Sequence, residues 1–114
     1  MKILKIEPLQ PPVSCDIDGS LSSMQSLVGG TIQILYPFTE DPDIALVCND
    51  EGKLLHLLPN RSLKDENGQI YDIVCGTFFL CGAPADSDRL TDLPQEKIDE
   101  YARKFYYAEL FFGL

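Results

Sequence analysis

The segment spanning residues 70–81 constrains the fold most, because almost every one of its side chains is apolar. A half-exposed strand alternates apolar and polar residues, whereas a continuous apolar run is typical of a strand that is covered on both faces. A chain of 114 residues has the size of one domain, which buries about two-thirds of the surface of its unfolded form. We therefore expect a single domain over residues 1–114 in which at least part of this segment is a buried strand.

Short apolar stretches separated by Pro and Gly predict the other strands. Alternation is clearest in residues 31–36, where Ile32, Ile34 and Tyr36 share one face. The Asn49-Asp50-Glu51-Gly52 sequence has the composition of a tight turn and predicts a hairpin between the stretches on either side of it. The predicted strands are Lys2–Ile6 and residues 31–36, 44–48, 53–58 and 70–81.

Two helices complete the predicted fold. Ser20 can cap a short helix whose apolar face ends at Val28, and Gly29 supplies the left-handed residue after it. The last helix has an apolar stripe that ends at Phe105, and Asp92 and Gln95 have the spacing of a capping box. The order is β-α-β-β-β-β-α. This order indicates an α+β fold, with a small antiparallel-rich sheet and the helices packed on one of its faces.

The charge and the cysteines exclude several classes of protein. With 18 acidic and 9 basic side chains the formal charge is −9, and nucleic-acid-binding proteins present basic surfaces, so we expect no direct contact with nucleic acid. The four Cys residues are scattered and there is a single His, which argues against a metal site and favours reduced, buried thiols. The N-terminal residues lack the apolar run of a signal peptide, and no stretch approaches the ~20 apolar residues that span a bilayer. We expect a cytoplasmic protein that makes no contact with a membrane.

Motifs of the common enzyme classes are absent from the sequence. It contains no phosphate-binding loop, no Gly-x-Ser-x-Gly and no Gly-x-Gly-x-x-Gly. His56 lies within a Leu-Leu-His-Leu-Leu run, where a structural role is more common than catalysis. We therefore predict no catalytic residue and no cofactor, and we favour a protein that is not an enzyme.

One group of polar residues is a candidate binding site. Asn49, Glu51 and Lys53 surround the predicted turn, and Asn60 and Arg61 follow the next stretch. Arg61 offers a planar fork for a carboxylate or phosphate, and Lys53 offers a point charge. The alternative is structural: the two Asn residues stabilise turns, and Arg61 pairs with Glu51 or Asp65.

Four motifs, taken in order, resemble a known family. They are Val28-Gly29-Gly30-Thr31-Ile32-Gln33, Asn49-Asp50-Glu51-Gly52-Lys53-Leu54, Leu58-Pro59-Asn60-Arg61 and Asp72-Ile73-Val74-Cys75-Gly76-Thr77-Phe78-Phe79. Over about residues 1–105 the chain is similar to domain of unknown function 3846. Thr31, Gln33 and Asp50 depart from that family's usual Tyr, Glu and Glu. The resemblance implies a small accessory protein of gut bacteria, bacteriophages and other mobile elements, and it implies no particular activity.

Two functions from different classes follow. The first is an interaction protein that binds a host or element-encoded protein, or a second copy of itself, through the aromatic tail from Tyr106 to Leu114. The alternative is that this tail folds back on the sheet of its own chain. A DNA mimic is a special case of this function, and it would need one continuous anionic face. The second function is binding of a small anionic ligand such as a nucleotide by Asn49, Glu51, Lys53, Asn60 and Arg61.

Overall fold

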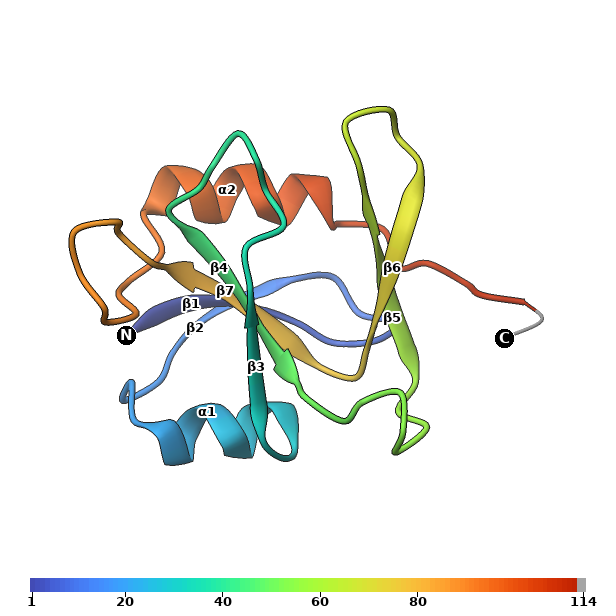
Figure 1. Cartoon of the computed structure of the whole chain (residues 1–114), viewed down its shortest axis with the longest axis horizontal. Helices are drawn as coiled ribbons and strands as arrows, with labels where there is room; N and C mark the ends of the chain where they lie inside the picture. The colour runs from blue at the N-terminus through green and yellow to red at the C-terminus, as the bar shows by residue number, and fades with distance from the viewer. Residues whose placement is uncertain (113–114) are drawn as a thin grey trace.

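The computed structural model describes residues 1–112, which form seven strands and two helices. Five strands make an antiparallel sheet in the order β2-β1-β7-β4-β3, and the other two pair as a separate antiparallel hairpin, β5-β6 (Figure 1). In the larger sheet β7 occupies the middle position, between β1 and β4. The elements are β1 Lys2–Ile6, β2 Val13–Asp16, α1 Leu21–Val28, β3 Ile32–Leu35, β4 Ile44–Asn49, β5 Pro59–Lys64, β6 Ile70–Cys75, β7 Phe78–Gly82 and α2 Gln95–Lys104.

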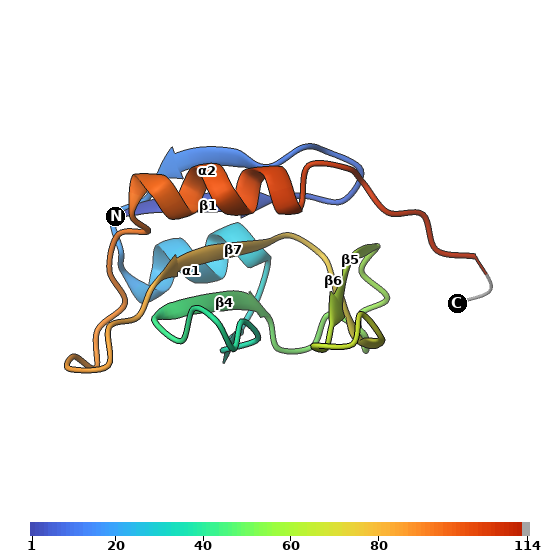
Figure 2. The same cartoon turned by 90° about the horizontal axis from the view of Figure 1, so that it is seen from above.

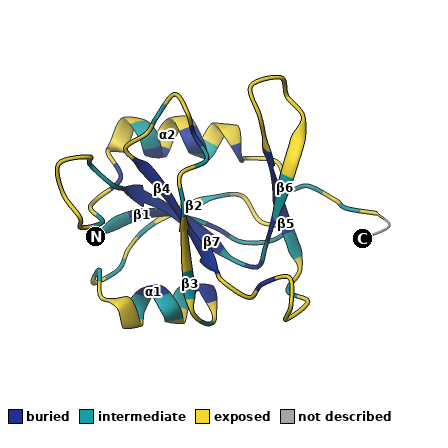
Figure 3. Ribbon diagram, viewed as in Figure 1, coloured by how far each residue is buried: buried dark blue, intermediate teal, exposed yellow. Residues whose placement is uncertain are grey.

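The two helices cover opposite faces of the larger sheet, with α2 in front of the strands and α1 behind them in Figure 2. Every residue of β7 is buried (Figure 3). Phe79 packs in one cluster with Met24 of α1, and Phe78 packs in the other with Ile98 of α2. The prediction of a strand covered on both faces is therefore confirmed. The prediction that both helices lie on one face is wrong, because a strand as apolar as β7 needs cover on each side.

The α+β class, the mostly antiparallel sheet and the order of the predicted elements are confirmed, with two additions. The short strand β2, which pairs with β1, was not predicted. The apolar segment forms two strands, β6 and β7, which belong to different sheets. The chain turns between them at Gly76, whose φ of 87° lies in the left-handed region that favours glycine.

The prediction of a strand over residues 53–58 is wrong, because this stretch folds into consecutive local turns. The N–H of Leu55 donates to the carbonyl of Glu51 at 2.9 Å, and the N–H of Leu57 donates to the carbonyl of Gly52 at 2.9 Å. His56 has a positive φ of 55°. These local bonds replace strand pairing, so the next strand, β5, begins later, and β4 pairs with β3 and with the more apolar β7.

The ends of α1 match the sequence pattern, whereas the start of α2 does not. The side chain of Ser20 accepts a hydrogen bond from the N–H of Ser23 at 3.0 Å, and Gly29 ends α1 with a φ of 80°. No side chain caps α2, which begins after Pro94. Asp92 instead accepts a hydrogen bond from the N–H of Lys2 at 2.8 Å, so it ties β1 to the segment that leads into α2. Neither helix of the described chain has the length and apolar character needed to cross a membrane.

All four cysteines are free thiols; Cys48 and Cys81 are buried, as the sequence predicts, whereas Cys15 and Cys75 are half-buried. Burial raises the pKa of the Cys48 thiol to about 11 and that of the Cys81 thiol to about 12. Both thiols therefore remain protonated at neutral pH and serve as small apolar groups in the core.

Asp41 attaches the loop between β3 and β4 to α2. Its carboxylate accepts a hydrogen bond from the Tyr101 hydroxyl at 2.6 Å and forms an ion pair with Lys97 at 2.8 Å. The Lys97 hydrogen bond and then that from Tyr101 hold the pKa of Asp41 below its usual value of 3.8. The loop is therefore fixed over the helix by a charged contact.

We expect Asp41→Asn to lower the free energy of unfolding by about 1 kcal/mol at neutral pH. The pKa of this carboxyl is lower in the folded state, so its contribution is complete above the unfolded value of 3.8 and is lost as pH falls through the folded value. Urea unfolding between neutrality and about pH 2.5 should show the two proteins converging only at the acid end. Asp43→Asn in the same loop is the control, and a difference that persists at the lowest pH would contradict the assignment.

Candidate functional site

Arg61 of β5 is fully buried, and the protein itself uses every N–H of its guanidinium group. Nε and Nη2 donate to the carbonyl of Phe105 at 3.2 and 2.9 Å, and Nη2 also donates to the carbonyl of Gln10 at 2.8 Å. Nη1 donates to the backbone carbonyl and to Oδ1 of Asn60 at 3.3 and 2.8 Å. Burial lowers the pKa of Arg61, and the charge of Glu109 opposes this effect. Arg61 therefore joins three distant segments and has no donor left for a ligand.

Asn60 connects the two sheets. It is fully buried, and its Nδ2 donates to the carbonyls of Ile6 in β1 and of Gly76 between β6 and β7, both at 2.9 Å. Its Oδ1 receives the bond from Arg61. Every polar atom of this side chain is engaged, so Asn60, like Arg61, has a structural role.

The other three candidate residues lie apart from this pair, around a small cavity of about 110 Å³. Asn49 is buried; its Nδ2 donates to the carbonyl of Val28 at 3.1 Å and its Oδ1 accepts the N–H of Glu51 at 2.7 Å. Lys53 forms an ion pair with Asp72, whose hydrogen bond raises the pKa of the lysine. The structure thus divides the five predicted residues into a buried pair and a turn. Among residues 1–112 no cluster of His, Cys, Asp and Glu has the arrangement of a metal site.

We expect anionic nucleotides to bind poorly, if at all, at millimolar concentration in the small cavity around Lys53. The small cavity holds one ammonium group, already paired, beside the carboxylates of Asp50, Glu51 and Asp72. A ligand present at 100 times its dissociation constant stabilises a protein by about 2.7 kcal/mol, which would raise the melting temperature by roughly 10 °C. We expect a thermal-shift screen of nucleoside mono-, di- and triphosphates at millimolar concentration to show no such rise. A saturable shift that Lys53→Met abolishes would contradict this expectation.

A larger groove, of about 680 Å³, lies elsewhere and was not predicted. Its walls come from residues 36–40 after β3, residues 62–67 at and after the end of β5, Tyr71 of β6, and Tyr101, Lys104, Phe105 and Glu109 at and beyond the end of α2. No local pattern identifies a groove assembled from four separate segments. The sequence did contain one signal, because Tyr36 continues the alternation of β3. In the fold its side chain is 58 % exposed.

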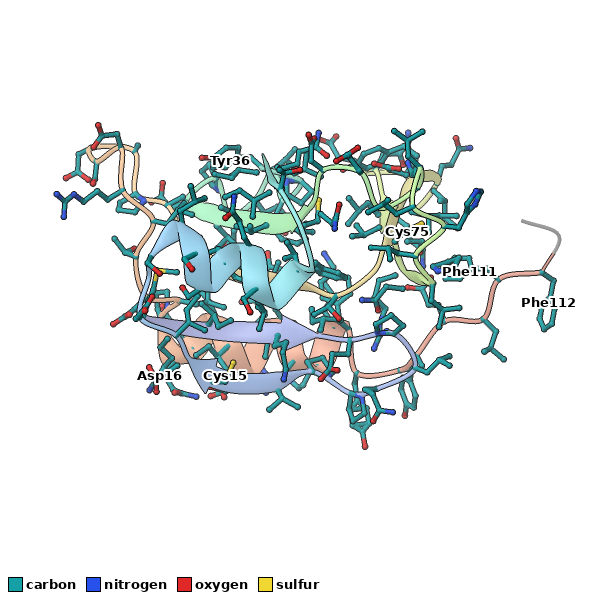
Figure 4. The ribbon with its side chains drawn as sticks, turned by 90° about the horizontal axis from the view of Figure 1, so that it is seen from below. Cys15, Asp16, Tyr36, Cys75, Phe111 and Phe112 are labelled. Carbon is teal, nitrogen blue, oxygen red and sulfur yellow. The ribbon has the colours of Figure 1, made fainter. Side chains whose placement is uncertain are left out.

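The C-terminal tail, residues 106–112 of the predicted 106–114, passes beside β5, and its end projects away from both sheets (Figures 1 and 2). Tyr107, Leu110 and Phe112 are 83, 70 and 89 % exposed, and Figure 4 shows Phe112 pointing away from the body. One side chain attaches the tail: Glu109 accepts hydrogen bonds from the backbone N–H and the hydroxyl of Ser62 in β5. Gly113 and Leu114 lie outside the described residues.

The comparisons with known proteins agree with the resemblance in the four motifs. A family model described as Domain of unknown function (DUF3846) matches residues 1–106. The chain belongs to this family. The matched part of the DUF3846 chain contains both sheets, both helices and the buried Arg61 with its hydrogen-bond partners, whereas most of the tail lies beyond it. No curated protein and no solved structure matches the DUF3846 chain.

Proposed function

We propose that this DUF3846 chain is a non-enzymatic accessory protein of a phage or mobile element, and that it binds a host or element-encoded protein through its tail. The observation that supports this proposal most directly is the exposure of Tyr107, Leu110 and Phe112 on one segment. Aromatic residues are enriched in the buried centres of protein interfaces, where they contribute most of the binding energy. A role as a small interaction protein also agrees with the mobile-element context that the resemblance implies.

The tail is held in a defined position, which favours binding. Its first residue follows Phe105, whose ring packs in the core and whose carbonyl accepts two hydrogen bonds from Arg61. Three residues later, Glu109 is bonded to Ser62. A segment positioned in advance loses less conformational entropy when a partner binds, so more of the contact energy contributes to affinity.

Affinity capture from host lysate with matched variants tests the proposal. The tail variant replaces Tyr107, Leu110 and Phe112 with Ser, and the control replaces Leu54, Leu55 and Leu58, which are also exposed, with Ser. We expect the tail variant to recover at least about tenfold less of a specific protein, whereas the control recovers it normally. Equal recovery by both variants would refute the proposal. Sedimentation of the purified chain distinguishes self-association from binding of another protein. Self-association through the tail would appear as a dimer that is absent in the tail variant.

A further inference from the structure

At the floor of the 680 Å³ groove the ammonium group of Lys104 lies over three aromatic rings. The rings of Phe38, Tyr101 and Phe105 pack together, with centroid separations of 4.6 to 6.4 Å. The Nζ atom of Lys104 lies 4.9, 5.4 and 5.8 Å from the same three centroids. The negative faces of aromatic rings attract an ammonium or guanidinium group, so this floor favours positive charge.

The rim of the groove also offers aromatic faces and negative charge, and here no cation of the described chain forms an ion pair with the carboxylates. Tyr36 and Tyr71 are 58 and 56 % exposed, and both line the groove. Glu40 and Glu66 are exposed on the same rim, and neither takes part in an ion pair formed within residues 1–112. The rim therefore combines two aromatic faces with two carboxylates that form no ion pair among residues 1–112.

The charge of this surface distinguishes between possible occupants. An anionic ligand would face the carboxylates of Glu40, Asp65, Glu66 and Glu109, which outnumber the two ammonium groups of the same lining, those of Lys64 and Lys104. The tail of a second copy is a poor match, because Glu109 is its single charged residue among residues 106–112 and no cation accompanies it. A cationic segment gains from the rim carboxylates, from the aromatic faces and from the net charge of −9, which attracts it from a distance.

We propose that the groove binds a basic, Arg- or Lys-containing segment of the protein that the tail holds. This inference rests on the proposed function and specifies the chemistry of the partner. Glu109 lies in the tail and also lines the groove, so the two form one continuous surface that a single partner contacts. A groove of this volume is within the range of about 300–1,000 Å³ that is typical of small-molecule sites, so it has room for a side chain of a partner.

Direct binding of short peptides to the full chain tests the groove. The probes are a fluorescein-labelled nonapeptide of alternating Arg and Gly and a Glu–Gly peptide of equal length, measured by fluorescence polarisation. We expect saturable binding of the Arg peptide, with at least tenfold weaker binding by Tyr36→Ala/Tyr71→Ala and by Glu40→Gln/Glu66→Gln. The matched control is Glu96→Gln/Asp86→Asn, which removes the same charge from exposed positions outside the groove and should change affinity less than about twofold.

Several results would overturn the inference. They are no binding of the Arg peptide, equal binding of the Glu peptide, equal loss in the control, or binding of free arginine as tight as that of the peptide.

The two proposals fail separately. If the tail variant loses the captured protein and the groove variants retain it, the groove inference is wrong and the proposed function stands. If the groove variants lose the Arg peptide while the tail variant captures normally, the groove is a binding site and the tail is not.

Discussion

Replacing Arg61 with Met is expected to lower the free energy of unfolding by roughly 3–5 kcal/mol, the largest effect of any single polar substitution in this chain. Met fills much of the same space but donates no hydrogen bond. The carbonyls of Phe105 and Gln10 and the oxygens of Asn60 would then lose their donors in the interior. A buried charge can often be replaced together with its partner by apolar residues at little cost. That route is closed here because most of the acceptors are backbone carbonyls.

Chemical unfolding of Arg61→Met beside Arg89→Met measures this effect. Arg89 is exposed, so its replacement should change stability by less than about 0.5 kcal/mol. Arg61→Lys separates charge from geometry, because it keeps the charge but has one ammonium group in place of the planar fork. We expect Arg61→Lys to lower the free energy of unfolding by more than half as much as Arg61→Met does. A Met variant as stable as the Arg89 control would show that Arg61 is dispensable.

Replacing Phe78 with Ala is expected to cost about 3–5 kcal/mol. Phe78 is 0 % exposed, and its ring lies 6.1 Å from that of Phe105, centroid to centroid. Truncation would leave a cavity between β7 and α2, and the neighbouring aromatic rings cannot collapse fully to fill it. Thermal unfolding should show a melting temperature lower by more than about 10 °C.

The control for this substitution is Tyr107→Ala, which removes a similar ring from an 83 % exposed position. We expect its melting temperature to lie within about 2 °C of that of the parent chain. Similar losses for the two variants would mean that the tail packs against the body in solution. In that case the tail would not be available to a partner.

The parts of the fold that the sequence predicted are those fixed by local chemistry. Ser20 and Gly29 delimit α1 because capping requires particular residues at particular positions. The apolar segment predicted buried strands because no other arrangement hides both of its faces. The prediction for residues 53–58 was wrong because their apolar content resembles that of a strand. Backbone hydrogen bonds such as that from Leu57 to Gly52 hold them in turns instead. Strand order depends on pairing between distant residues and leaves no local signal.

The candidate site was harder to predict than the fold. An Arg in a short polar stretch of an acidic chain suggests an exposed anion site. Arg61 is buried instead, and its guanidinium group donates to backbone carbonyls 44 and 51 residues away in the sequence. Asn60 is equally polar in sequence and equally structural in the fold. The aromatic content of the tail marked it as a candidate interface, but the sequence left open a tail folded back on the sheet, and its exposure follows from the fold. The groove required the arrangement of four segments in space.

The position of β7 has a consequence for how the chain assembles during synthesis. The strand in the middle of the larger sheet is the last of the seven to leave the ribosome, and β1 and β4 are joined through it. Until residue 82 has emerged, the edges of β1 and β4 that pair with β7 in the finished sheet both lack their partner strand. Both edges therefore gain their partner from one strand, and the larger sheet can be completed only after that strand has emerged.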